Sequence, residues 1–390
     1  MAPSGTLSDG QPVLGWSVLL MGLAALAFVT VQPALFAAYV TVGALVGALH
    51  LPVLARTSRE QIIVGSVLVV ATCSLLAVNV FRYPTTLAHF VITAVAVVSA
   101  LVVTGDPVRY RKASLVTLVT AQVALLLYAA WVGLDKAPTP LEGIFPTAST
   151  NAITSCLVVL QLNYCVAGFF VRNRPPLLTP LLTFAICVIG YGRGSIVIAA
   201  AIVIVSVVFA VISTRRNIMP LLAVGLVGVP VAAWGLGIAD SVVAQTKLAA
   251  GLYDEARARM IMEYLGRLNG WTLFVGAPYD GSGIQTQFHG NPHNSLIRAH
   301  HIFGLPYVAL VLITPLLVLA GSLEMRTRLF IAIMLALAIL RGLTETILFP
   351  SVLDVFYFGA ALGLGLAGPG TPLASARSRS DQVSSGLSWR

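Results

Sequence analysis

The stretch "SIVIAAAIVIVSVVFAVIS", residues 195–213, decides the fold of this chain. It carries no charged side chain from end to end. A helix of about 20 apolar residues is long enough to cross the hydrocarbon core of a bilayer, which is roughly 30 Å thick. The stretch therefore predicts a transmembrane α-helix.

Similar apolar runs fill most of the chain, in which 58% of the residues are hydrophobic and only 9% are charged. A composition so poor in charge excludes an ordinary soluble domain. We expect an all-α, polytopic membrane protein with about twelve transmembrane helices. The predicted spans are residues 13–31, 34–54, 61–81, 86–104, 113–133, 151–171, 176–190, 195–213, 218–238, 294–320, 329–345 and 349–367.

Cationic side chains gather in one alternate set of the short loops between these spans. Loops rich in Arg and Lys stay on the cytoplasmic side of a membrane. The sequence thus predicts a multi-pass protein of the cytoplasmic membrane with both termini inside, and its net charge of +9 calls for no nucleic-acid partner. The loop cations on this side are Arg56, Arg59, Arg109, Arg111, Lys112, Arg172, Arg174, Arg215, Arg216, Arg326 and Arg328.

One connection, residues 239–293, is far longer than the others and lies on the outer face. Long connections in a compact domain are usually functional. We expect a single membrane domain over residues 1–367, with this outer loop as its catalytic part. Residues 368–390 are rich in Ser, Pro and Gly and predict a disordered cytoplasmic tail.

The outer loop contains a predicted amphipathic helix, residues 253–268. Ile261, Tyr264, Leu265 and Leu268 form its apolar stripe. The opposite face carries a charged row of Arg259, Glu263 and Arg267 at four-residue steps. The row is either a solvated ladder of ion pairs or a set of guanidinium groups that faces an anionic ligand.

The segment "GNPHNSLIRAH", residues 290–300, lies where the loop enters the next span. Pro292 fixes a turn, and Asn294 or Ser295 can cap the helix. His293 then lies at a helix N-terminus, where the dipole favours a neutral imidazole that can act as a general base. The competing interpretation is a histidine that only bonds the backbone of the capping turn.

A metal site is the other interpretation of this histidine cluster. His289 and His293 are four residues apart, but Pro292 breaks any helix that would align them. The glutamate of an H-E-x-x-H motif is also absent. We therefore expect no metal and no cofactor.

Arginines recur at the same outer ends. Arg193 lies in the glycine-rich turn "GYGRGS", residues 190–195, where it either reaches lipid headgroups or helps to hold an anion. Arg298 and Arg341 lie near the ends of two spans, as ligand contacts or as partners of Glu345 or Asp354. Guanidinium groups bind phosphate oxygens in pairs, so this set suits a diphosphate.

These motifs resemble the O-antigen ligase/polymerase superfamily of bacterial membrane glycosyltransferases. Three features carry the resemblance, in order along the chain, and the predicted twelve-span layout agrees with it over nearly the whole chain. They are the turn Gly192-Arg193-Gly194-Ser195, the outer loop with an arginine-led helix and a glycine turn at Gly276, and the motif Pro292-His293-Asn294-Ser295-Leu296.

The resemblance implies a metal-independent enzyme that polymerises or ligates glycans at the outer face. A glycan on polyprenyl diphosphate is the donor, and a glycan or lipid-linked hydroxyl is the acceptor. His293 would be the base, and Arg193 and one loop arginine would hold the diphosphate. Either Arg257 or Arg259 fits that position, and we prefer Arg259 because it lies opposite the apolar stripe. Further substrate contacts are expected from Arg257, Arg267, Arg298, Arg341 and Asn294.

Two alternatives remain open from the sequence. One is a transporter or flippase for a lipid-linked or anionic solute, which would place ionisable groups at mid-membrane on broken helices. The other is a glycan polymerase whose base is a carboxylate. The candidate carboxylates are then Asp254, Glu255, Asp280 and Glu345.

Overall fold

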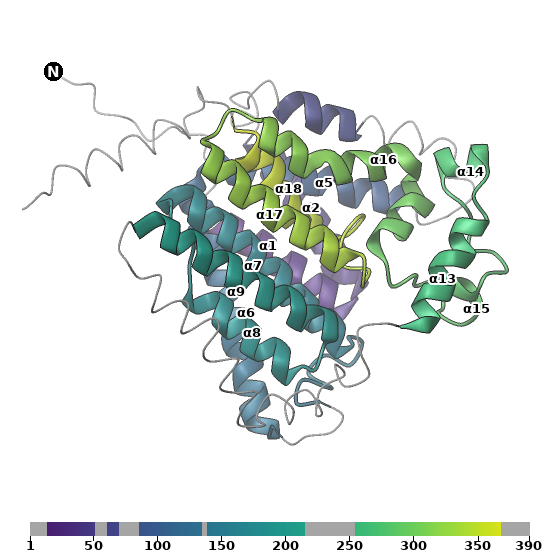
Figure 1. Ribbon diagram of the computed structural model, residues 1–390, viewed down its shortest axis with the longest axis horizontal. Coiled ribbons are helices and arrows are strands. Elements are labelled where there is room, and N and C mark those ends of the chain that lie inside the picture. The colour runs from purple at the N-terminus through teal and green to yellow at the C-terminus, as the bar shows by residue number, and fades with distance from the viewer. Residues whose placement is uncertain (1–13, 51–60, 70–85, 135–138, 215–253, 368–390) are drawn as a thin grey trace, which may run out of the picture.

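The computed structural model describes residues 14–50, 61–69, 86–134, 139–214 and 254–367, and all regular elements within these ranges are helices (Figure 1). Residues 61–69 are also helical. The predicted span 218–238 and the predicted tail 368–390 lie outside the described residues. The helices are α1 (Leu14–Thr30), α2 (Pro33–Leu49), α5 (Thr86–Thr104), α6 (Pro107–Val132), α7 (Thr150–Arg172), α8 (Leu178–Ile189), α9 (Arg193–Thr214), α13 (Glu255–Gly266), α14 (Gly270–Val275), α15 (Gly283–Thr286), α16 (Ser295–Ala320), α17 (Met325–Gly342), α18 (Asp354–Phe358) and the π-helix η3 (Gly359–Gly365).

Five of these helices, α5, α6, α7, α9 and α16, are long and apolar enough to cross a membrane. The helices α1, α2 and α8 and the segment Asp354–Gly365 are shorter but also apolar. The all-α class is confirmed for the described residues, and a multi-pass membrane protein follows from these helices. The full number of twelve spans stays a prediction.

Helix α7 is the centre of the bundle. Its most apolar stretch is buried throughout, and α1, α6, α8, α9 and α17 all pack against it. The polar side chains of this helix are bonded inside the bundle: Gln161 donates to the Thr179 hydroxyl (3.3 Å) and Asn163 to the Ser114 hydroxyl (2.9 Å). Figure 1 shows α7, α9 and α17 lying side by side.

The two ends of the bundle differ in chemistry. At one end, the Arg326 guanidinium donates to the Phe209 carbonyl (2.8 Å) and lies over the Phe169 ring, joining α17, α9 and α7. Arg326 and Arg328, two of the cations that were predicted to be cytoplasmic, lie at this end. At the opposite end, Arg341 of α17 donates to the Ser155 hydroxyl of α7, close to the start of α9. The predicted site residues gather at this second end.

Helix α16 is broken at Gly304, although the sequence predicts one continuous span over 294–320. Gly304 has φ 71° and ψ −173°, a conformation that is open essentially only to glycine. A Cβ there would lie 2.1 Å from the Phe274 carbonyl oxygen. The break therefore lets α14 pack directly against the α16 backbone, which connects the long loop before α16 to the bundle.

We expect Gly304→Ala to lower the free energy of unfolding by roughly 3 kcal/mol or more, because it combines a forbidden conformation with a backbone clash. Thermal unfolding in detergent measures the effect. Gly266→Ala is the matched control, since a Cβ at Gly266 meets no atom within 4 Å. Equal melting temperatures for the two variants would contradict this account of the break.

Candidate functional site

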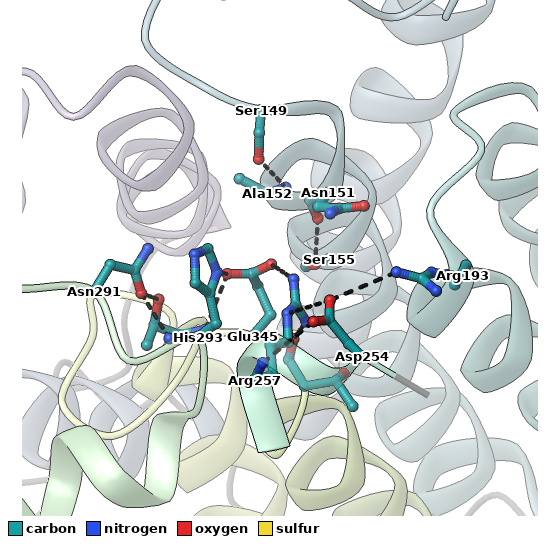
Figure 2. Close-up of polar contacts among 12 residues, drawn as sticks. Ser149, Asn151, Ala152, Ser155, Arg193, Asp254, Arg257, Asn291, His293 and Glu345 are labelled. Atoms are coloured by element: carbon teal, nitrogen blue, oxygen red, sulfur yellow. Dashed lines mark hydrogen bonds and ion pairs between the residues drawn. The ribbon is translucent and has the colours of Figure 1, made fainter. Parts of the chain in front are cut away.

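The candidate site lies where four segments meet at one end of the bundle: the starts of α9 and α13, the turn before α16, and the loop after α17. Figure 2 shows their side chains as a row from Asn291 through His293, Glu345 and Arg257 to Asp254 and Arg193. The sequence separates Arg193 from Glu345 by most of the second half of the chain, so only the fold brings them together.

The turn before α16 holds His293 in an unusual conformation. Its φ is +45°, in the left-handed region that non-glycine residues rarely adopt. The Asn291 side-chain oxygen accepts the His293 backbone N–H (2.9 Å) and the Thr346 hydroxyl (2.8 Å), which fixes this turn. Strained backbone of this kind is concentrated at functional sites.

Asn294 caps α16, as one of the two predicted capping residues. Its side-chain oxygen accepts the backbone N–H groups of Leu296 (2.9 Å) and Ile297 (3.0 Å). The residue is only 5% exposed. The geometry therefore gives Asn294 a positioning role, and its expected substrate contact stays a prediction.

Glu345 is the partner of His293. The His293 Nδ1 atom lies 3.0 Å from the Glu345 Oε1 atom. Burial opposes ionisation of this carboxyl, but the hydrogen bond from His293 and the nearby charges of Arg341 and Arg257 outweigh it and leave the pKa of Glu345 below its ordinary value. An ionised carboxylate can only accept, so Nδ1 carries the proton and Nε2 is the basic nitrogen.

The His293–Glu345 pair borders a cleft with a volume of about 590 Å³. One wall is formed by the turn before α16 and the loop after α17, with Asn291, Arg298 and the pair itself. The other wall comes from α1, α2, α5 and the start of α7, and includes His89. A cleft of this size is in the range of small-molecule and sugar sites.

Arg257 and Arg193 lie on the side of Glu345 away from Asn291 (Figure 2). The Arg257 guanidinium is 3.9 Å from Glu345 and 3.4 Å from Asp254. The Arg193 guanidinium is 3.6 Å from the same Asp254 oxygen. Asp254 thus bridges two arginines that come from different helices, and about a quarter to a third of each of these side chains stays exposed.

Arg259 does not join this group. Its guanidinium is 75% exposed and lies 3.8 Å from Glu255, itself 72% exposed. The inward face of α13 is formed by Met260 and Tyr264, which are buried. Arg257 lies on that face because it is three residues before Met260. The geometry therefore favours Arg257 over Arg259 as the arginine of the site, and the catalytic assignment of Arg259 stays a prediction.

Arg267 supports the loop. Its guanidinium donates to the carbonyls of Asp280 (2.6 Å) and Gly281 (2.9 Å) and pairs with Glu263 (3.1 Å). This is the predicted i, i+4 ion pair, extended by two backbone contacts. Arg267 thus ties the end of α13 to the Asp280–Gly281 turn.

The two remaining arginines, Arg341 and Arg298, donate hydrogen bonds to protein groups around the site. Arg341 is 2% exposed and donates to the hydroxyls of Thr344 (2.6 Å) and Ser155. A Cβ at Gly194 would lie 3.1 Å from this guanidinium, which explains a glycine beside Arg193. Arg298 donates to the carbonyls of Leu348 (3.2 Å) and Pro350 (2.8 Å) at the cleft wall. Their expected contacts with substrate stay predictions.

The sequence did not assign Glu345 to His293. Glu345 was noticed as an acidic residue at the end of a predicted span, but its expected partners were Arg298 and Arg341. Asp254 and Asn291 were likewise not expected as partners. Among the residues that the structure describes, no three His, Cys, Asp or Glu side chains lie together as a set of metal ligands.

The fold and the site together define a class: a helical, multi-pass membrane protein with a polar site at one end of its bundle. Comparisons of the chain with protein-family models, with curated proteins and with solved structures found no match.

Glu345→Gln tests the pair. The amide oxygen can still accept from Nδ1, but the negative charge beside His293 is lost. The folded protein favours the ionised Glu345 carboxylate, because the pKa of Glu345 is lowered in the folded state. That stabilisation is complete above the ordinary glutamate pKa of about 4.3 and is lost as pH falls through the lowered value.

The stability difference between wild type and Glu345→Gln should therefore shrink as the pH falls below about 4. Thermal unfolding across pH measures it. Glu255→Gln is the control, since Glu255 is 72% exposed and lies outside the row. If the stability difference between wild type and Glu345→Gln grew below about pH 4, the Glu345 carboxyl would be neutral in the folded protein.

Proposed function

We propose that this protein is a membrane glycosyltransferase that polymerises or ligates glycans carried on polyprenyl diphosphate. The observation that carries the proposal is the ordered row of a histidine–glutamate pair and two arginines beside a large cleft at one end of the bundle. A base and a diphosphate-binding pair are the two functions that such a transfer requires.

In this mechanism, the acceptor hydroxyl lies in the cleft and gives its proton to the Nε2 atom of His293. The hydroxyl oxygen forms a bond to the anomeric carbon of the donor glycan. The bond between that carbon and the phosphate oxygen breaks, and its electron pair stays on the leaving polyprenyl diphosphate. Glu345 stabilises the imidazolium, which then releases its proton to water.

The arginines act on the leaving group. Negative charge grows on the diphosphate as the bond breaks, and fixed cationic donors stabilise that charge more than the ground state. Arg257 and Arg193 come from α13 and α9, so a diphosphate between them would also join the outer loop to the bundle. In the structure the Asp254 carboxylate occupies this bridging position.

Asp254 is therefore expected to compete with the diphosphate for Arg193 and Arg257. Asp254→Asn should bind inorganic pyrophosphate about two- to fivefold more tightly, because it removes an ion pair of the strength found at partly exposed sites. Asparagine keeps the side-chain oxygen that accepts the backbone N–H of Arg257 at the start of α13. Calorimetry on protein in nanodiscs measures the affinity. Weaker binding than wild type would contradict a competing role.

The transporter alternative differs in what happens to the donor. A flippase moves the lipid-linked glycan across the membrane without breaking a bond. Proteoliposomes that contain the purified protein and a labelled polyprenyl-diphosphate oligosaccharide separate the two functions. We expect glycan-free polyprenyl diphosphate to form when an acceptor is present. Movement of intact donor between leaflets, without cleavage, would support the transporter instead.

A further inference from the structure

The short helix α14 presents large apolar side chains outward. Trp271 is 60% exposed, Phe274 49% and Leu273 43%. Figure 1 shows α14 at the periphery of the structure, beside α16. We call these three side chains the α14 face. Rigid apolar surface of this kind marks a place where a protein contacts an apolar partner.

The exposure does not come from a loose segment. Asn269 caps α14 by accepting from the backbone N–H groups of Trp271 (3.0 Å) and Thr272 (2.9 Å). The C-terminal end is fastened to α16, because the His300 Nε2 atom lies 2.7 Å from the Leu273 carbonyl oxygen. A Cβ at Gly276 would lie 2.2 Å from the His300 carbonyl oxygen, so the two backbones are in direct contact.

The α14 face continues the apolar outer stripe of α16. Phe274 touches Gly304 through its carbonyl, and Leu305 follows Gly304 directly. Leu305, Leu312 and Leu316 are 39%, 43% and 62% exposed and share one side of α16 by their i, i+7, i+11 spacing. On a helix apolar enough to span a membrane, such a stripe faces lipid tails. The α14 face extends it toward the site end.

We propose that the α14 face is immersed in the lipid leaflet at the site end of the bundle, at the boundary between headgroups and acyl chains. Tryptophan favours this boundary because its ring is apolar and its N–H is polar. The polar part of the loop lies elsewhere, where Arg267 binds the Asp280 and Gly281 carbonyls. Lipid contact then holds α13, and with it Arg257, at a fixed height above the bilayer. The proposal does not depend on the proposed function.

Tryptophan fluorescence tests this placement. The full chain is placed in nanodiscs of phosphatidylcholine brominated at carbons 6 and 7 of one acyl chain, and the signal of Trp271→Phe is subtracted from that of wild type. We expect the Trp271 fluorescence to fall by roughly half or more relative to unbrominated lipid. Acrylamide in the water phase should quench it little.

Arg259→Trp in the Trp271→Phe background is the matched control. Arg259 is 75% exposed on α13 and pairs with Glu255, so a tryptophan there should be quenched by acrylamide and not by brominated lipid. Quenching of Trp271 by acrylamide alone would show that the α14 face contacts water. Quenching by neither agent would show that protein covers it, a second copy or another segment of the chain. Either result overturns the proposal.

Discussion

Replacing His293 is expected to lower glycan transfer by about 100- to 10,000-fold, the usual contribution of a general base. Its Nε2 atom is the basic nitrogen because the Nδ1 proton is held by Glu345 at 3.0 Å. The loss should fall on kcat, since the proton leaves the acceptor hydroxyl in the transition state. Turnover of a polyprenyl-diphosphate oligosaccharide by the purified protein measures it.

The choice of variant matters here, because residue 293 has φ +45°. Asparagine tolerates this left-handed conformation better than alanine does, so His293→Asn removes the base with little change in backbone strain. We expect His293→Asn and His293→Ala to be equally inactive, and His293→Asn to melt near the wild-type temperature. Retention of a tenth or more of the activity by a folded His293→Asn protein would reject the base assignment.

The second large effect is expected at Arg257. Under the proposed function, Arg257→Ala should lower kcat by about 100- to 1,000-fold, because it removes one of the two guanidinium groups that we propose stabilise the leaving diphosphate. Arg257→Lys should recover only part of this loss, since an ammonium group cannot bind two phosphate oxygens as a planar fork does.

Arg259→Ala is the matched control on the same helix. Its guanidinium is 75% exposed and outside the row, so we expect activity within about threefold of wild type. Both variants remove one positive charge from α13, which makes their total charge identical. If Arg259→Ala were the more damaging variant, the diphosphate would bind on the outer side of α13 and the site described here would be misplaced.

Helix positions could be predicted well from the sequence because they depend on local pattern. The apolar stretch 195–213 lies within α9 (Arg193–Thr214), and the predicted loop helix 253–268 contains α13 (Glu255–Gly266). The observed helix ends differ from the predicted ones where a side chain or a glycine changes the backbone conformation. Helix α6 begins at Pro107, earlier than the predicted residue 113, because Asp106 caps it by accepting from Val108 and Arg109.

The last predicted span shows the same effect. Residues 349–367 were expected to form one helix, but α18 begins only at Asp354. The Asp354 carboxylate accepts the backbone N–H groups of Phe349 (2.9 Å) and Ser351 (2.8 Å), which stabilises a turn in place of the first helical turns. A short apolar pattern does not reveal such a turn.

Single residues of the site could be predicted from the sequence, but not which of them contact one another. His293 could be predicted because the turn and cap residues at the start of α16 lie next to it in the sequence. Glu345 lies far along the chain from His293, and Arg257 and Arg259 lie on different sides of one helix. Which side faces inward depends on how α13 packs. The predicted stripe included Leu265, yet Leu265 is 49% exposed while Met260 and Tyr264 are buried.

Mass spectrometry can measure the lipid and glycan products after the purified protein in nanodiscs is mixed with a polyprenyl-diphosphate oligosaccharide and a hydroxyl acceptor. We predict that wild type forms polyprenyl diphosphate and a longer glycan in equal amounts, and that His293→Asn forms neither. Unchanged donor with the wild-type protein, or equal product from wild type and His293→Asn, would contradict it.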